Sequence, residues 1–410
     1  MNVRRTAAVL AATAVLGAAA PAVAADASPS PSPSVAIPSG LYGDTDPSYD
    51  GVWRQSLALV AQDLVGEKPA AEAVDWLVGQ QCEDGAFPAY RADATTQCGS
   101  GTQVDTNSTA AAVQALTALG GHDAETVHAL RWLKDAQNAD GGWGYTADGP
   151  SDANSTSLVV GALAAVGDDP EEQRSEDGNS PYDALAALAV PCDEDGGGAF
   201  AYQPDAKGTL TANADATAAA VLGSLGKGFV AEADETGAAA GTGACADGDD
   251  LTPQDAARNG AAYLSEELAK DGHLTSALAG AEDQPDHGNT ADAVVALAAA
   301  GATESTAKPL AWLQENGPRW AAQAGPAAYA QLVFAAHATG TDPRDFGGTD
   351  LVKELNATGP DTEASAAPAA EETSGDDGSG VSVWWFVAVF LVAGVGIGLA
   401  LSTRGRKRRP

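Results

Sequence analysis

A block of sixteen residues that changes from polar to alanine-rich occurs five times in this chain. The first copy, DTNSTAAAVQALTALG, covers residues 105–120, and the others begin at residues 152, 211, 286 and 325, at spacings of 47, 59, 75 and 39 residues. Most copies open with side chains that cap helices, all run through small apolar residues, and all end at a glycine, which is typical of a helix. Repeats at such spacings predict a stacked or closed array of one supersecondary unit.

A second kind of helix, marked by an aromatic residue followed by leucine, is expected before most of these blocks. The pairs are Trp76-Leu77, Trp132-Leu133, Tyr263-Leu264 and Trp312-Leu313. Apolar residues around Trp76 recur on one side at helical spacing, whereas the alanine-rich blocks are apolar on nearly every side. We therefore expect an all-α array of helix pairs, with the one-sided helices outside and the alanine-rich helices inside.

The most specific motif, Q-x3-G-x-W, lies between the outer and the inner helix. It is complete from Gln137 to Trp143, and the copy that begins at Gln81 has Phe87 in place of tryptophan. Weaker copies begin at Glu194, Leu268 and Gln314. The glycine permits a tight turn, the aromatic ring covers a helix end, and the glutamine amide can bond to free backbone groups. The motif is thus predicted to be structural.

These turns and helices resemble the terpenoid cyclase and prenyltransferase α/α-toroid superfamily. That superfamily includes squalene and hopene cyclases, protein prenyltransferase β-subunits, complement thioester domains and cobalamin carriers. The resemblance covers roughly residues 50–356 and implies a toroid, or barrel, of about six helix pairs. Five pairs are visible, and residues 52–65 as an inner helix with residues 349–356 as its outer partner complete the expected ring. Such a fold does not fix a function.

Both ends of the chain carry segments that predict export and anchoring. Arg4 and Arg5 precede an apolar run and an A-x-A site, as in a secretory signal. Residues 381–401 are apolar and uncharged, long enough to cross a bilayer, and a basic run follows them. The expected order is a signal peptide (1–24), a Ser/Pro-rich linker (25–39), the toroid (40–356), an acidic disordered tether (357–380), a transmembrane helix (381–401) and a basic cytoplasmic tail (402–410).

A short segment near the end of the expected toroid bears on localisation. Residues Leu355 to Gly359 resemble a sortase signal, which would exchange the membrane helix for a cell-wall linkage. Asn356 replaces the usual proline of such signals, and the tether places the segment far from the apolar stretch. We therefore expect a single-pass protein of the cell membrane, with its N-terminal domain outside the cell.

The charge of the chain restricts its partners. It has 21 basic and 56 acidic residues, and removing the seven basic residues of the two termini leaves a formal charge of −42. Such a surface repels nucleic acid and anionic lipid. Residues 193–195 and 247–250 are acidic, but neither segment has a complete calcium-loop pattern, and the histidines are scattered. We therefore expect no metal and no cofactor.

The cysteines number four, which on an exported chain predicts disulfides. They are Cys82, Cys98, Cys192 and Cys245, and three pairings remain open. The preferred pairing joins Cys82 to Cys98 and Cys192 to Cys245, because each bridge then stays within loops or adjacent repeats.

In an array of this kind every inner helix runs in the same direction, so the inner-helix N-termini gather at one mouth. Each brings a partial positive charge and unpaired N–H groups, and a polar ring around a concave centre is where ligands usually bind. The candidate ligand-binding residues are Asp105, Thr106, Asn107, Asp152, Asn154, Asn213, Asp215, Asp286, Asn289 and Tyr329. The alternative is that these residues only cap the helices.

The first functional hypothesis is a non-enzymatic surface protein that binds a bulky polar small molecule. The resemblance suggests cobalamin, because the carriers have Asp-Thr-rich starts on their inner helices, similar to Asp105-Thr106, Asp152 and Asp286. Those carriers close over the ligand with a second, β-rich domain, and nothing after residue 356 predicts one. A partner chain that acts as a lid or transporter, or another ligand, is therefore expected.

Two alternatives stay open. One is a structural or adhesive surface protein, which a central opening plugged by Trp, Leu and Val would favour. The other is a class II terpene cyclase, whose Asp-x-Asp-Asp acid is matched by residues 247–250. That string lies in an insertion between repeats, and 6% aromatic residues are few for steadying a carbocation. A prenyltransferase is excluded by the signal peptide, and the Gly-Cys-Gly-Glu-Gln thioester motif is absent from the sequence.

Overall fold

The computed structural model describes residues 36–236, 244–246, 248, 251–276 and 284–362. Within these ranges the chain forms twelve α-helices, one 3-10 helix, η1 (Pro343–Asp345), and a short antiparallel pair of strands, β1 (Leu274–Thr275) and β2 (Pro285–Asp286). The prediction of an all-α fold is confirmed.

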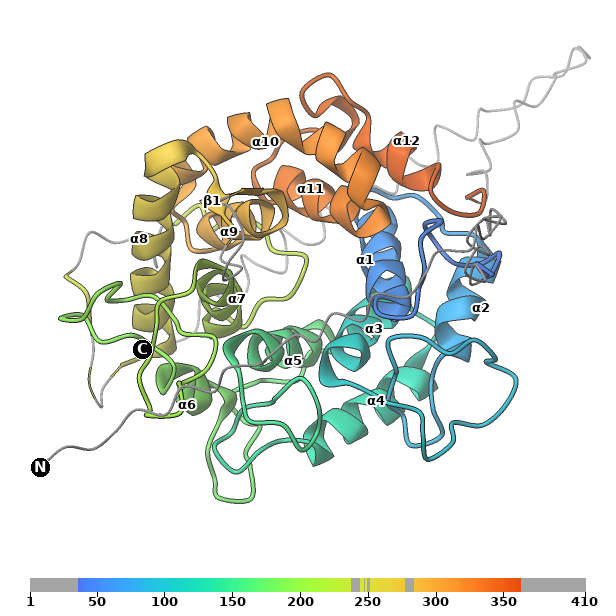
Figure 1. Cartoon of the computed structure of the whole chain (residues 1–410), viewed down its shortest axis with the longest axis horizontal. Coiled ribbons are helices and arrows are strands. Elements are labelled where there is room, and N and C mark those ends of the chain that lie inside the picture. Colours follow the sequence, from blue (N-terminus) through green and yellow to red (C-terminus); the bar gives the residue numbers. More distant parts are fainter. Residues whose placement is uncertain (1–35, 237–243, 247, 249–250, 277–283, 363–410) are drawn as a thin grey trace, which may run out of the picture. The chain divides into compact units, whose positions relative to one another are not determined.

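Six helices pack side by side in a closed ring (Figure 1). In ring order they are α1 (Gly51–Leu64), α3 (Thr106–Leu119), α5 (Ala153–Ala165), α7 (Ala214–Ser224), α9 (His287–Ala299) and α11 (Pro326–Ala338), which contacts α1 again. The five alanine-rich blocks correspond to α3, α5, α7, α9 and α11. Small side chains suit them to this position, because each helix has neighbours on several sides.

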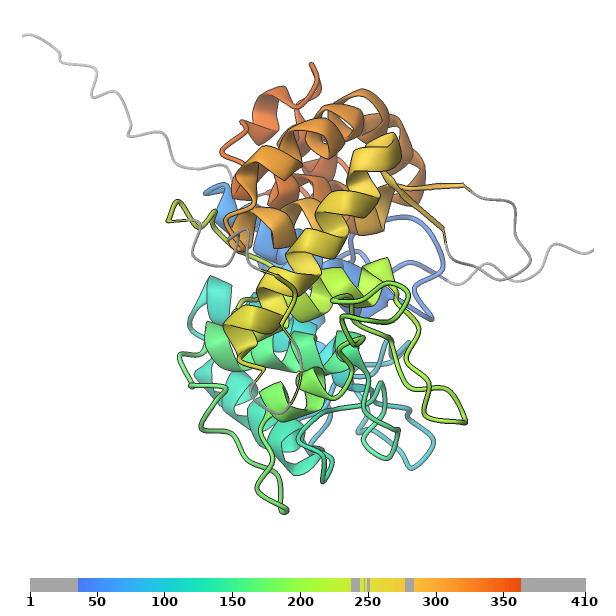
Figure 2. The ribbon, with the colours of Figure 1, turned by 90° about the vertical axis from the view of Figure 1, so that its left-hand side faces the viewer.

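The other six helices lie outside the ring, each against an inner helix. They are α2 (Ala71–Gly79), α4 (Asp123–Asp135), α6 (Pro181–Ala186), α8 (Pro253–Asp271), α10 (Thr303–Ala324) and α12 (Leu351–Asn356). Burial separates the layers: ten of fourteen residues are buried in α3 but only four of thirteen in α4. Figure 2 shows α8, in yellow, running obliquely across the outer side.

The two ends of the described unit meet and complete the ring. Gln62 Nε2 donates to Asn356 Oδ1 at 2.6 Å, and the backbone N–H of Gly43 donates to Thr358 O at 2.8 Å. Arg344 and Glu67 form an ion pair at 2.8 Å across the same junction. The predicted pairing changes in one respect: α12 packs mainly on α11, and the outer neighbour of α1 is α2.

The Q-x3-G-x-W turns have the contacts that the motif predicts. Gln137 Nε2 donates to Gly141 O at 2.7 Å, and Trp143 Nε1 donates to the carbonyl of Leu133 at the end of α4, at 2.6 Å. Gly141 has a φ of +91°, and a Cβ at this position would lie 2.2 Å from the Ser180 carbonyl oxygen. The glycine therefore serves both the turn and the close approach of the next repeat.

The weak copy at residues 314–320 is not a turn, which corrects the sequence interpretation. These residues lie within α10, which continues through Pro318 to Ala324. Pro318 occupies the place that Gly141 has in the complete motif. Proline fixes φ near −65°, so it cannot adopt the positive φ of the turn, and the helix continues.

A threonine hydroxyl near the start of four inner helices accepts the backbone N–H of the preceding turn, an arrangement that we call the threonine lock. The four bonds, from the turn amide to Oγ1, are Phe87 to Thr109 (2.9 Å), Trp143 to Thr156 (3.0 Å), Phe200 to Thr217 (2.9 Å) and Leu274 to Thr290 (2.9 Å). In three of these repeats the N-cap residue also donates its N–H to the turn carbonyl. Each lock therefore holds a helix start against its turn.

The locked helices share a direction. Figure 2 shows the segments that precede α3, α5 and α7, together with β1 and β2 before α9, on one side of the ring. The N-termini of these four helices therefore open toward that side, as the repeats predict.

Both preferred disulfides are confirmed. Cys82 is bonded to Cys98 and Cys192 to Cys245, with Cα–Cα distances of 5.4 and 5.8 Å. Each bridge fastens a loop next to a turn between the helix layers.

The expected membrane elements lie elsewhere in the chain. In the described ranges no helix is long and apolar enough to cross a membrane. The predicted signal peptide (1–24), transmembrane helix (381–401) and basic tail (402–410) fall outside the described residues, as do most of the linker and the tether.

We predict that Thr156→Val destabilises the protein by about 1–3 kcal/mol, because the buried N–H of Trp143 loses its acceptor without a change in side-chain size. The matched control is Thr117→Val in α3, whose buried Oγ1 has no partner among the described residues. This control should change the free energy of unfolding by no more than about 0.5 kcal/mol. Denaturant unfolding measures both, and equal losses would contradict the role of the lock.

Candidate functional site

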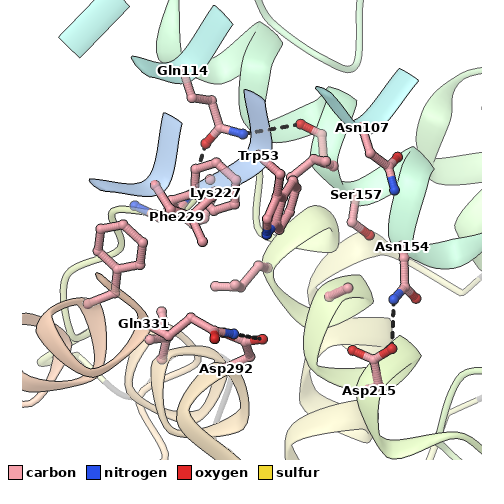
Figure 3. Close-up of a pocket in the computed structure, with 17 residues that line it drawn as sticks. Trp53, Asn107, Gln114, Asn154, Ser157, Asp215, Lys227, Phe229, Asp292 and Gln331 are labelled. Carbon is pink, nitrogen blue, oxygen red and sulfur yellow. Dashed lines mark hydrogen bonds between the residues drawn. The ribbon is translucent and has the colours of Figure 1, made fainter. Parts of the chain in front are cut away.

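The centre of the ring contains a cavity of about 260 Å³, lined by side chains from all six inner helices (Figure 3). One part of its wall is polar, formed by Asn107, Asn154, Ser157, Asp215, Asp292 and Gln331. The rest is mainly apolar, with Trp53, Leu222, Val295, Phe229 and Phe334. Such a mixed lining is typical of small-molecule sites.

The common direction of the helices brings the polar side chains together. Asn107, Asn154 and Asp215 are each the second residue of their helix, in α3, α5 and α7. Asn154 Nδ2 donates to Asp215 Oδ2 at 2.8 Å, as Figure 3 shows. The polar wall is therefore a direct product of the repeat.

A second carboxylate lies deeper, one turn into α9. Gln331 of α11 points at Asp292 and donates from Nε2 to both of its carboxylate oxygens, at 3.2 and 3.0 Å. Burial raises the pKa of Asp292 to about 7, and the charges of Asp215 and Asp286 act in the same direction. The ionisation of Asp292 is therefore shifted from the acid range toward neutral pH.

The negative charge of this wall has no ionic partner in the described part of the chain. Burial also raises the pKa of Asp215, which the Asn154 hydrogen bond opposes. None of the ion pairs among the described residues includes Asp215 or Asp292. Lys227 lines the same cavity, but it is exposed.

The segment that follows α7 forms the apolar floor of the cavity. Phe229 donates its backbone N–H to Gln114 Oε1 at 2.9 Å, and Asp234 N donates to Ala298 O near the end of α9. The Phe229 ring lies edge-on to that of Trp53, with 5.6 Å between the ring centroids, and stacks on that of Phe334, with 6.0 Å between the centroids. The central cavity thus has aromatic side chains on one side and polar groups on the other.

The ten predicted site residues divide into groups. Asn107, Asn154 and Asp215 line the cavity. Four residues cap their helices by accepting a backbone N–H: Asp105 from Ser108, Asp152 from Ser155, Asn213 from Ala216 and Asp286 from Asn289. The last three lie elsewhere: Thr106 and Tyr329 are buried, and Asn289 Nδ2 donates to Asp286 at 2.9 Å.

Sequence reasoning missed Asp292, Gln331, Trp53 and Phe229. A signal existed for the first two, because each is a polar residue flanked by apolar residues in the middle of a helix that has neighbours on several sides. Trp53 and Phe229 gave no comparable signal, since aromatic residues at such positions are usually part of a core.

No group of three or more His, Cys, Asp or Glu among the described residues could hold a metal ion. The acidic segment at residues 193–195 belongs to this described part, whereas residues 247, 249 and 250 lie outside it.

Comparison with known proteins gives one sequence similarity. The chain is 33% identical over 156 residues to drimenyl diphosphate synthase from Streptomyces showdoensis, covering 36% of this chain and 26% of that protein. The matched part therefore spans about a quarter of the relative's length. This similarity supports the resemblance to terpenoid cyclase-like proteins that was inferred from the repeats. No family model matches the sequence.

Two solved structures are similar at low identity. The type II terpene cyclase MstE from Scytonema is 14% identical with a TM-score of 0.43, over 68% of this chain and 73% of that one. A sugar epimerase from a ruminal bacterium is also 14% identical with a TM-score of 0.43, over 68% of this chain and 80% of that one.

We predict that Asp292→Asn stabilises the protein increasingly as pH rises. The raised pKa of Asp292 means that the folded state binds this proton more tightly than the unfolded state, whose carboxyl has its ordinary value of 3.8. The resulting stability is complete below that value and is lost as pH rises toward 7. Asparagine avoids this loss, so the variant should melt higher by on the order of 3 °C at pH 8.

The matched control for this measurement is Asp135→Asn, which removes an exposed carboxylate from the outer helix α4. Thermal melts from pH 4 to pH 8 compare each variant with the original chain. If the difference in melting temperature between Asp292→Asn and the original chain stays constant with pH, Asp292 does not have a raised pKa in the cavity.

Proposed function

We propose that this chain, a protein similar to the terpenoid cyclase-like superfamily, binds a small molecule in the cavity at the centre of its helix ring. The observation that carries the proposal is a cavity whose wall comes from all six inner helices, with polar groups on one side and aromatic rings on the other. The toroid of six helix pairs supplies the rigid frame, and the polar mouth supplies the recognition.

The size of the cavity favours a compact ligand. Its volume of about 260 Å³ lies just below the range of roughly 300–1,000 Å³ that is usual for small-molecule pockets. Cobalamin, which the resemblance suggests, stays a prediction. A corrinoid would rest on the mouth above the cavity, with a partner chain as its lid, because it is too bulky for the ring interior.

We place this binding function outside the cell. The two disulfides support an oxidising compartment, and the predicted signal peptide and apolar segment 381–401 give export and a single-pass anchor. Leu355 is 1% exposed within α12, and Thr358 O accepts the N–H of Gly43. Because residues Leu355 to Gly359 are built into the fold, membrane anchoring is favoured over a sortase-made cell-wall linkage.

A second candidate function is acid-catalysed cyclisation of an isoprenoid chain. It is favoured by Asp292, a largely buried acid whose pKa of about 7 leaves it partly protonated, near the rings of Trp53 and Phe229. An acid of this kind can protonate an alkene, and aromatic faces steady the cation that forms. The carboxylate-rich wall repels an anionic diphosphate, which places binding ahead of this candidate. An adhesive role rests on the acidic outer surface and on Trp53, Leu222 and Val295, which fill part of the centre of the ring.

The proposal predicts that filling the cavity weakens ligand binding. A thermal-shift screen of compact amphiphilic molecules and cobalamin should identify stabilising ligands, because a ligand that binds only the folded state raises its melting temperature. Ala219→Leu, which places a larger side chain on the cavity wall, should weaken the affinity for such a ligand at least about tenfold.

The matched control is Ala165→Leu, at an exposed position near the end of α5. Equal binding by both variants would remove the cavity as the site, and a screen without any stabilising ligand would contradict the proposal. Cyclised products from a linear isoprenoid alcohol or diphosphate, detected by mass spectrometry and absent for Asp292→Asn, would support the second candidate instead.

A further inference from the structure

The polar wall of the central cavity is rich in hydrogen-bond acceptors, and the donors in it that have no partner among the described residues include the Asn107 amide and the Ser157 hydroxyl. Asp215 and Asp292 contribute carboxylates, and the donors that face them, Asn154 Nδ2 and Gln331 Nε2, are already used by these two groups. A ligand at this wall therefore meets mainly oxygen atoms with lone pairs to share.

A second observation is independent of the carboxylates. Ser157 is 5% exposed, lines the cavity from α5, and its Oγ has no hydrogen-bond partner among the described residues. Asn154 Oδ1 is also buried without a partner, while its Nδ2 is held by Asp215. Asn107 Oδ1, which also lines the cavity, is a third buried oxygen without a partner among the described residues. These three oxygens lie together at one wall, where a group inside the cavity can satisfy them.

The charge of the site points to the same kind of group. Asp292 accepts a hydrogen bond from Gln331 of α11. The charged groups that act on it are the carboxylates of Asp215 in α7 and of Asp286 at the start of α9, and both are negative. Neither cavity carboxylate has a partner among the described ion pairs, and Lys227 is exposed. A positively charged ligand would compensate this buried negative charge.

The apolar half of the cavity fits the remainder of such a ligand. The Phe229 ring meets that of Trp53 edge to face and stacks on that of Phe334. Aromatic faces attract cations and also cover an apolar body. The cavity is therefore divided into an anionic end and an aromatic end.

We propose that the ligand class of this chain is a compact organic amine, bound as its ammonium ion. The ammonium group lies between Asp292 and Asp215 and donates its three N–H groups to these two carboxylates and to one of the unpaired oxygens of Ser157 and Asn154. The body of the amine packs on Trp53 and Phe229. This inference rests on the proposed binding function and names its ligand class.

The pH dependence follows from the ionisation of Asp292. The ammonium ion needs the ionised carboxylate, and an alkylamine stays charged well above neutral pH. Affinity should therefore rise as pH increases through about 7. Protonation of an alkene by Asp292 needs the opposite form of the acid, so the cyclase candidate predicts the opposite dependence.

Three probes of one shape test the inference: 2-phenylethylamine, 2-phenylethanol and 3-phenylpropanoate, titrated calorimetrically into the full-length chain. The amine should bind at least about tenfold more tightly than the alcohol, and the propanoate should not bind. The affinity for the amine should increase severalfold from pH 6 to pH 8, while that for the alcohol stays constant.

Variants assign the effect to the two carboxylates. Asp292→Asn and Asp215→Asn should each lower the affinity for the amine about tenfold and leave the alcohol unaffected, whereas the exposed Asp135→Asn should change neither. Thermal melts of each variant verify that it is folded before titration.

Two outcomes overturn the inference. Equal or tighter binding of the alcohol, without pH dependence, contradicts an ammonium site but leaves small-molecule binding in the cavity intact. Failure of all three probes to bind also overturns the amine assignment, and the compound screen with Ala219→Leu then decides separately whether the cavity binds any ligand.

Discussion

A hydrogen bond from a backbone amide to a threonine hydroxyl fixes the starts of four of the six inner helices of the ring. It recurs at Thr109, Thr156, Thr217 and Thr290. The partner amides belong to the turns between outer and inner helices, where an unpaired buried N–H is unfavourable. Because the hydroxyl lies one turn after the N-cap, the bond fixes both the position and the direction of the helix that follows.

The common direction of the helices also explains how the cavity tolerates its carboxylates. Asp215 is the second residue of α7, where the partial positive charge of a helix N-terminus favours an anion. Asp292 lies a turn further along α9, beyond most of that effect, and burial raises its pKa to about 7. Burial raises the pKa of both carboxylates, which two neighbouring repeats bring into a single cavity.

Local patterns predicted the parts of the structure that local forces decide. The five alanine-rich helices, the glutamine contacts of the turns and both disulfides follow from capping, glycine conformation and chain proximity. The short helix α6 was missed because it lacks an aromatic-leucine pair, although Ser180 and Asp183 form a capping box. The copy at residues 314–320 was misleading because it keeps the spacing of the motif but has Pro318 in place of the glycine that the turn needs.

The cavity itself depends on contacts between distant repeats, which no local pattern records. Gln114 of α3 binds Phe229 from beyond α7, and Gln331 of α11 binds Asp292 of α9. The sequence placed polar residues at the inner-helix starts, and three of these reach the cavity. The packing of the ring decides which of the remaining predicted residues only cap their helices.

Hydrogen exchange resolved to single amides tests the threonine lock most directly. The amides of Phe87, Trp143 and Phe200 lie in connections between helices, where exchange is ordinarily fast, and that of Leu274 lies in the two-residue strand β1. Each donates to a threonine in the structure. If the lock holds the ring, all four should exchange as slowly as the core amides of the inner helices, through global unfolding. Exchange at the rate of exposed loops would contradict it.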